Sequence, residues 1–331
     1  LSILYGTSNY FPELPQTVFL RSSKDQDVPN RHIGGHERSR SMRKRDGSIR
    51  VTHEDCKMAT EMFLPGFVSK KYITYTNPIV RERVTDMAQK IRKQLKKAVD
   101  YAGASWMTIH DSRHAQKKLD AMIIRVAEPN TWHEEPFGAQ LQMTNYLHNM
   151  ELIRRYRVQR QWERWDPNLG KPNRDDIQQF QAPLSTVNAM YSPITNTITI
   201  YAGILQYPFV HERYDNATMY ATIGTVIGHE MAHGFGPYGR RFDSEGLFRA
   251  GRMGWWERAT VTKYDEQIQC IINEYGSPAT VAQLRQKCPN LPETNAYGQM
   301  VITEEVADVM GVRAAYDAYW TAQKELESVD A

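Results

Sequence analysis

The stretch Thr222-Ile-Gly-Thr-Val-Ile-Gly-His-Glu-Met-Ala-His233 places the pattern His-Glu-x-x-His at the end of a run of small and apolar residues. On a helix, His229 and His233 lie one turn apart on the same face, so their imidazoles can bind one Zn²⁺ ion. Glu230 then lies close enough to act on a water molecule at the metal. Glycine and proline follow at once in Gly234-Phe-Gly-Pro237 and end the helix. The alternative is a pair of hydrogen-bonded core histidines, but this context favours a metal-dependent hydrolase.

A third metal ligand is expected in the later apolar stretch from Val301 to Tyr316. Glu304 and Asp308 are four residues apart there and therefore share a helix face. Glu304 can complete a three-residue zinc site that leaves one position open. Asp308 can accept a hydrogen bond from the second ring nitrogen of a histidine ligand. Such a pair alone is usually a solvated helix face, but after the His-Glu-x-x-His motif it predicts the other half of the site.

Four motifs together resemble the neprilysin / endothelin-converting-enzyme family of zinc metalloendopeptidases. In chain order they are Val187-Asn-Ala-Met-Tyr191, Tyr201-Ala-Gly-Ile-Leu-Gln-Tyr-Pro-Phe209, Val226-Ile-Gly-His-Glu-Met-Ala-His-Gly-Phe235 and Glu304-Glu-Val-Ala-Asp308. The resemblance extends over roughly residues 56–320. It implies that one Zn²⁺ per chain is bound by His229, His233 and Glu304, that Glu230 is the general base, and that Asp308 supports the metal site.

The resemblance also implies a peptide-binding surface. Asn188 and the backbone of Ala189 would hold an extended peptide as an added strand. Three apolar residues match positions that line the pocket for the side chain just after the cleaved bond: Ile204, Phe209 and Val226. Ordinary core packing explains these three equally well. The implied activity is cleavage of oligopeptides on the amino side of apolar residues.

The chain departs from the family in several places. Gly234-Phe-Gly-Pro237 stands where the family has Gly-Phe-Asp-Asp. By resemblance, residues 56–331 correspond to a catalytic domain lacking the C-terminal tail, in which the family carries a histidine and an arginine that assist catalysis. Residues 1–55 correspond to a remnant of the preceding helical domain with a basic, disordered insertion. These departures leave an alternative open, an inactive or impaired peptidase homologue that serves as a zinc-stabilised binding or structural protein.

The pattern of apolar residues predicts an α+β fold that is mainly helical. Helices are expected over 81–101, 112–126, 137–165, 215–234, 255–275 and 300–324. Two β-rich segments, 184–191 and 195–202, are separated by Ser192-Pro193 and predict a hairpin beside the zinc helix. The family resemblance implies a thermolysin-like zincin core with this small sheet.

The net charge of +3 is distributed unevenly along the sequence, which contains one basic segment. Residues 21–50 hold nine Lys or Arg against four acidic residues, a net charge of 9 − 4 = +5. A solvated, disordered insertion is favoured, since the segment has few large apolar residues. A processing site at Arg43-Lys-Arg45 is a second interpretation. Nucleic-acid binding is not expected, because no aromatic residues lie among the basic ones.

Targeting and modification signals are sparse. No run of 18 apolar residues predicts a membrane span, and no signal-peptide pattern begins the chain. By resemblance the chain belongs to an extracellular or cell-surface ectodomain, and a membrane anchor in the parent protein stays open. Asn216-Ala-Thr218 is a glycosylation sequon. The resemblance pairs Cys56 and Cys270 with cysteines outside this chain. The alternatives are that these thiols are free or that Cys270 pairs with Cys288.

Overall fold

The computed structural model describes residues 52–128, 132, 137–163, 165–166, 171–172 and 182–329. The chain divides into two compact units, residues 1–63 and residues 64–331. In the first unit, helix α1 (His53–Phe63) begins with a reciprocal pair of bonds. The Asp55 amide donates to Thr52 Oγ1 (3.1 Å) and the Thr52 amide donates to Asp55 Oδ2 (2.8 Å), which satisfies amides at the helix start. The basic segment 21–50 lies outside the described residues.

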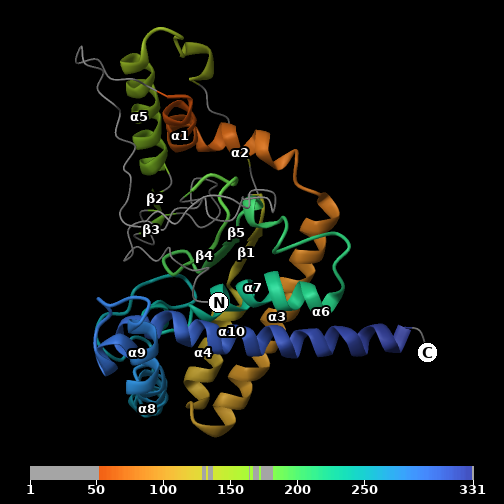
Figure 1. Ribbon diagram of the computed structural model, residues 1–331, viewed down its shortest axis with the longest axis vertical. Coiled ribbons are helices and arrows are strands. Elements are labelled where there is room, and N and C mark those ends of the chain that lie inside the picture. The colour runs from red at the N-terminus through yellow and green to blue at the C-terminus, as the bar shows by residue number, and fades with distance from the viewer. Residues whose placement is uncertain are drawn as a thin grey trace. The chain divides into compact units, whose positions relative to one another are not determined.

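The second unit combines helices with a small sheet (Figure 1). Its described α-helices are α2 (Pro65–Ile73), α3 (Pro78–Ser105), α4 (Ile109–Asp120), α5 (Tyr146–Glu163), α6 (Asn216–Met219), α7 (Thr225–Ala232), α8 (Arg258–Tyr275), α9 (Pro278–Arg285) and α10 (Thr294–Val329). The 3₁₀ turns among the described residues are η2 (Gly138–Gln140), η4 (Ala202–Ile204) and η6 (Gly239–Arg241). The predicted fold class, mainly helical α+β, is confirmed.

A three-stranded sheet lies beside the motif helix, with strand order β1-β5-β4. Strands β4 (Ala189–Ser192) and β5 (Thr197–Ile200) form the predicted antiparallel hairpin, with Ala189 opposite Ile200. Strand β1 (Ile123–Val126) runs parallel to β5. All four residues of β5 are buried, whereas β4 is an edge strand among the described residues. Strands β2 (Trp165–Asp166) and β3 (Lys171–Pro172) pair separately.

Two predicted helices have the wrong bounds. The single helix expected over 112–126 is wrong, because α4 ends at Asp120 and Ile123–Val126 forms β1. Three of these four residues are β-branched and favour a strand, and the partner strand β5 lies too far along the chain for local spacing to reveal. The helix expected over 137–165 begins only at Tyr146.

The predicted zinc helix forms a continuous helical segment from Asn216 to Ala232. Asp215 caps it, because its carboxylate accepts a hydrogen bond from the Thr218 amide at 2.7 Å. A π-helical turn, η5 (Tyr220–Gly224), separates α6 from α7. Such turns occur often at functional sites, and this one lies directly before the helix that carries the motif.

Helices α7 and α10 touch through their backbones, and α10 lies across α7 (Figure 1). A Cβ added at Gly228 would lie 2.4 Å from the carbonyl oxygen of Gly311. A Cβ added at Gly311 would lie 2.3 Å from the backbone nitrogen of His229. Real Cβ atoms essentially never approach so closely, so this crossing requires glycine on both helices.

We expect Gly311→Ala to lower the free energy of unfolding by roughly 1–3 kcal/mol, because the added methyl group forces the two helices apart. This loss should exceed the gain of about 1 kcal/mol that alanine brings to a helix interior. Urea denaturation measures the change. Gly138→Ala is the control, since a Cβ there meets nothing within 4 Å. A Gly311→Ala variant as stable as the parent would contradict the importance of this contact.

Candidate metal centre

Three of the predicted site residues meet at one point. His229 and His233 lie on α7 and at its C-terminal end, and Glu304 projects from α10. Glu304 Oε2 lies 3.3 Å from His229 Nε2 and 3.6 Å from His233 Nε2. One ligand atom from each residue falls within 4.8 Å of the other two. A tetrahedral ion with bonds of about 2.0–2.1 Å separates its ligand atoms by about 3.4 Å, so this donor set fits Zn²⁺.

Asp308 lies behind this cluster, as predicted. Its Oδ1 is 2.7 Å from His229 Nδ1, on the opposite side of the ring from Glu304. Burial lowers the pKa of His229, but hydrogen bonds to Asp308 and Glu304 outweigh burial and raise this pKa to about 10. A histidine held at both nitrogens by carboxylates has a fixed orientation and surroundings that attract a cation.

His233 has the opposite electrostatic environment. Its ring centroid lies 4.4 Å from that of His229, with the two rings nearly perpendicular. Burial and then the positive charge on His229 lower the pKa of His233 to about 4. The imidazole is therefore neutral near pH 7, which is the form that binds a metal ion. Because these pKa shifts are opposite, the pair of imidazoles favours one positive charge over two.

Glu230 is buried, with 5% of its surface exposed. Burial raises the pKa of Glu230 to about 7, although His229 and a hydrogen bond from the Tyr191 amide both act in the opposite direction. A cation at the neighbouring cluster would lower this pKa. A carboxyl group balanced near neutrality can accept a proton and return it, which is what a general base requires.

Strand β4 passes directly beside Glu230. Alternate amides of an edge strand point away from its partner, and the Tyr191 amide on that outer side donates to Glu230. At the start of the strand, the Ala189 amide bonds to Asn188 Oδ1 at 2.9 Å. The Asn188 carbonyl accepts a bond from Tyr201 at 3.1 Å and so extends the pairing with β5. The predicted peptide-binding residues therefore lie on the strand edge that leads to Glu230.

The three predicted pocket residues are buried to different degrees. Ile204 and Val226 are buried with 4% and 3% of their surfaces exposed, and Phe209 is half-buried. Such burial is compatible both with core packing and with the wall of a pocket. Their role in substrate binding stays a prediction.

Sequence reasoning missed Lys118 and the amide of Tyr191. Lys118 follows another lysine in a helix with many polar residues, which indicates a solvated position. The side chain is instead fully buried. A backbone amide such as that of Tyr191 carries no sequence signal at all.

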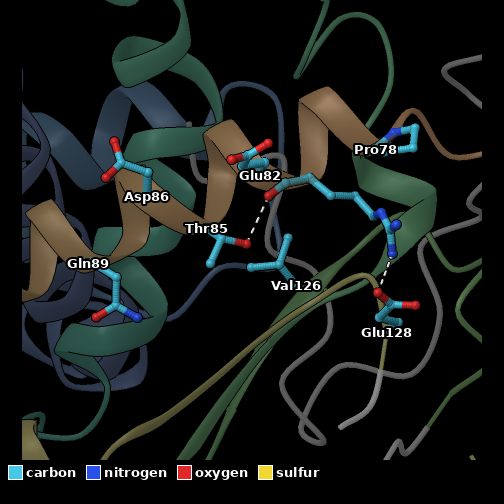
Figure 2. A pocket seen from close by; sticks show the side chains of 8 residues that line it. Pro78, Glu82, Thr85, Asp86, Gln89, Val126 and Glu128 are labelled. Atoms are coloured by element: carbon cyan, nitrogen blue, oxygen red, sulfur yellow. Dashed lines mark hydrogen bonds and ion pairs between the residues drawn. The ribbon is translucent and has the colours of Figure 1, made fainter.

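The described residues contain two further features of interest, a second cluster of possible ligand atoms and an open hollow. His110, Asp111 and Glu257 also bring ligand atoms within 4.8 Å, but His110 and Glu257 are exposed. Asp111 there accepts the Glu257 amide at 2.7 Å and thus links α4 to the start of α8. The second feature is an open hollow of about 480 Å³ along α3, lined largely by polar side chains such as Glu82 and Asp86 (Figure 2). Arg81 and Glu128, which both line it, form an ion pair. Neither feature combines a base with a buried ligand set.

Residues 188–330 match the family model described as Peptidase family M13. This region belongs to peptidase family M13. Membrane metallo-endopeptidase-like 1 of Homo sapiens is 30% identical over 257 residues, which cover 73% of this chain and 30% of the relative. Endothelin-converting enzyme 1 of Mus musculus is 31% identical over 242 residues, covering 71% of this chain and 29% of the relative. The chain thus spans about 30% of the length of these relatives, and the family resemblance seen in the sequence is confirmed.

Solved structures support the same assignment. A zinc metalloprotease of Mycobacterium tuberculosis, solved with an inhibitor, has a TM-score of 0.65 and 25% identity. The match covers 84% of this chain and 39% of that protein. PepO of Lactobacillus rhamnosis shares the fold with a TM-score of 0.60 and 21% identity, over 80% of this chain and 38% of that one. The M13 region therefore has the fold of zinc metalloproteases.

Cys56, Cys270 and Cys288 are exposed and free of disulfides among the described residues, so the predicted pairings are without structural support. Asn216 of the sequon is the first residue of α6, and its glycosylation stays a prediction. Among the described helices, none combines the length and apolar character needed to cross a membrane.

We expect Asp308→Ala to weaken zinc binding about 10- to 100-fold, because His229 loses the carboxylate that orients its ring. Competition with a chromogenic chelator measures the affinity. Asp317→Ala is the control, since this carboxylate of the same helix pairs with Arg313 instead. Equal zinc affinity in the Asp308→Ala variant and the parent would contradict the assigned role.

Proposed function

We propose that this chain is the zinc-binding core of an M13 endopeptidase that cleaves oligopeptides on the amino side of apolar residues. The observation that carries the proposal is the position of Glu230, a buried carboxyl group between a three-residue ligand set and a strand edge. A purely structural metal site has no use for a buried base beside its ligands. The names of the relatives, which include metallo-endopeptidase and endothelin-converting enzyme, support the same activity.

His229, His233 and Glu304 would hold one Zn²⁺ per chain. When bound, the ion supplies a Lewis acid that polarises the scissile carbonyl and makes water more acidic. Glu230 takes a proton from the attacking water and passes it to the leaving amine. Asp308 keeps His229 in the orientation and tautomer that direct Nε2 toward the ion.

The edge of β4 would hold the substrate backbone. An extended peptide can pair with the edge of a sheet through main-chain hydrogen bonds, and alternate side chains then enter pockets. Asn188 and Ala189 start this edge, and Tyr191 brings it to Glu230. Val226 lies one turn before Glu230 on α7, so it is the best placed of the three apolar residues to contact the side chain after the cleaved bond. Ile204 and Phe209 complete the proposed pocket by family resemblance.

A second candidate function is a zinc-stabilised binding protein derived from a peptidase. The observation in its favour is Gly236-Pro237, which replaces two acidic residues of the family pattern. The complete set of ligands and the buried Glu230 favour catalysis instead. Peptides are the expected partners in both cases. An extracellular or cell-surface location is proposed from the relatives, one of which is named a membrane metallo-endopeptidase.

We expect Glu230→Gln to reduce peptide cleavage by at least about 10²-fold, because the amide cannot accept the proton from water. Bound zinc should be retained, since Glu230 is outside the ligand set. A quenched peptide library with varied residues after the cleavage point measures both turnover and preference. Glu305→Gln is a matched control on α10, because Glu305 bonds to Tyr275 rather than to the metal cluster.

Three outcomes of that library assay are informative. Cleavage before large apolar residues that disappears in the Glu230→Gln variant supports the proposal. Cleavage that persists in this variant refutes the role of Glu230. No cleavage by folded, zinc-loaded parent protein favours the non-catalytic function for this chain.

Removal of zinc should lower the thermal unfolding temperature as well as activity, because an ion that binds only the folded state stabilises it. At a free zinc concentration of 1,000 times Kd this stabilisation is about 4 kcal/mol. Differential scanning calorimetry before and after chelation measures the effect. Zn²⁺ should restore the original unfolding temperature and Mg²⁺ should not, since imidazole ligands suit zinc and not magnesium. Equal restoration by Mg²⁺ would argue against a zinc site.

A further inference from the structure

Lys118 of α4 is a charged side chain with no exposed surface. Its Nζ donates hydrogen bonds to the carbonyl oxygens of Gly234, Gly239 and Phe242, each at 2.7 Å. An ammonium group has three donors, so every one of them is used. Carbonyl oxygens surround bound metal cations in a similar way, but here the cation is the ammonium group of Lys118.

Burial of this group opposes its charge. Burial lowers the pKa of Lys118 to about 7, against the effect of the carboxylate of Asp243. Aromatic faces complete the surroundings, with Nζ 5.9 Å from the ring centre of Tyr191 and 5.6 Å from that of Phe235. Losing the ammonium would leave three buried carbonyl groups without this donor, and each such loss is costly.

The segment that Lys118 holds, residues 234–242, directly follows the ligand His233. Its middle folds back against this ligand, because a Cβ at Gly239 would lie only 1.9 Å from the carbonyl oxygen of His233. The start, middle and end of the segment are all bonded to the single Nζ atom. One side chain thus fixes the path of the backbone where it leaves the motif helix.

The same residue is linked to the proposed base. The Lys118 carbonyl accepts a hydrogen bond from Asn196 Nδ2 at 2.9 Å, and Asn196 Oδ1 accepts one from the Tyr191 hydroxyl at 3.0 Å. The backbone amide of Tyr191 donates to the carboxyl group of Glu230. Lys118 therefore joins α4, the hairpin and the segment after His233.

We infer that Lys118 is a positioning residue of the metal centre, whose ammonium holds residues 234–242 and thereby fixes His233 for metal binding and catalysis. The backbone carbonyl of Lys118, which side-chain substitution leaves in place, connects the same position to Tyr191 beside Glu230. The hydrogen bonds of the Lys118 ammonium go to backbone carbonyls that follow His233 in the chain. The catalytic half of this inference rests on the proposed function. The half that concerns metal binding is independent of peptide cleavage.

The test replaces Lys118 by Met, an apolar side chain of similar length. We expect zinc affinity to fall about 10- to 100-fold, as for other residues that orient ligands. Amide hydrogen exchange should accelerate within residues 234–242. In an active enzyme, kcat should fall with KM nearly unchanged, because substrate binds to the unaltered edge of β4. Ser112→Ala is the control, since this buried residue of the same helix bonds to the Val99 carbonyl of α3 instead.

Lys118→Gln provides a second variant if the Met variant does not fold. Its amide keeps two of the three donors, so it should give a smaller loss of zinc affinity in the same direction. Zinc affinity and local exchange equal to those of the parent in a folded variant would overturn the inference. Exchange that accelerates equally throughout the protein would also overturn it, because that result indicates general destabilisation. If the parent binds zinc but cleaves nothing, the proposed activity fails while affinity and exchange still decide the role of Lys118.

Discussion

The metal centre depends on the contact between two glycines. Gly228 and Gly311 allow the backbones of α7 and α10 to meet with no side chain between them. On α10, Glu304, Asp308 and Gly311 are spaced by four and three residues, which places both carboxylates on the helix face that meets α7. On α7, Gly228 immediately precedes His229. The distance between the helices therefore sets the distances between the ligands, and a wider crossing would separate imidazoles from carboxylates.

The electrostatics of the centre follow from that close packing. Glu230, Glu304 and Asp308 bring three carboxyl groups close to two imidazoles. Burial penalises the charged forms of Glu230 and Glu304. The pKa shifts of His229 and His233 go in opposite directions, so the pair favours a single positive charge. A divalent cation would neutralise the carboxylates more completely than this one proton does. The opposite pKa shifts of the two histidines are therefore those expected of a site that binds a divalent cation.

Local patterns were sufficient for those parts of the fold that depend on neighbouring residues. The His-Glu-x-x-His motif and the spacing of Glu304 and Asp308 predicted which side chains meet, because helical periodicity fixes their faces. The hairpin at β4 and β5 was also predicted from its β-rich segments. Strand β1 was not predicted, because its four residues continue an apolar helical pattern and its partner strand β5 begins more than seventy residues later. Lys118 escaped prediction for a related reason, because three distant carbonyl groups create its environment.

The separation of the two ligand-bearing helices along the chain has a consequence for biosynthesis. The histidines emerge from the ribosome before Glu304 and Asp308, and α10 must then dock against α7 through the two glycines before the third ligand arrives. Until that moment the motif offers only two imidazoles, which hold an ion weakly. A site with all three ligands therefore exists only once α10 has docked against α7, and the formation of the motif helix alone is not sufficient.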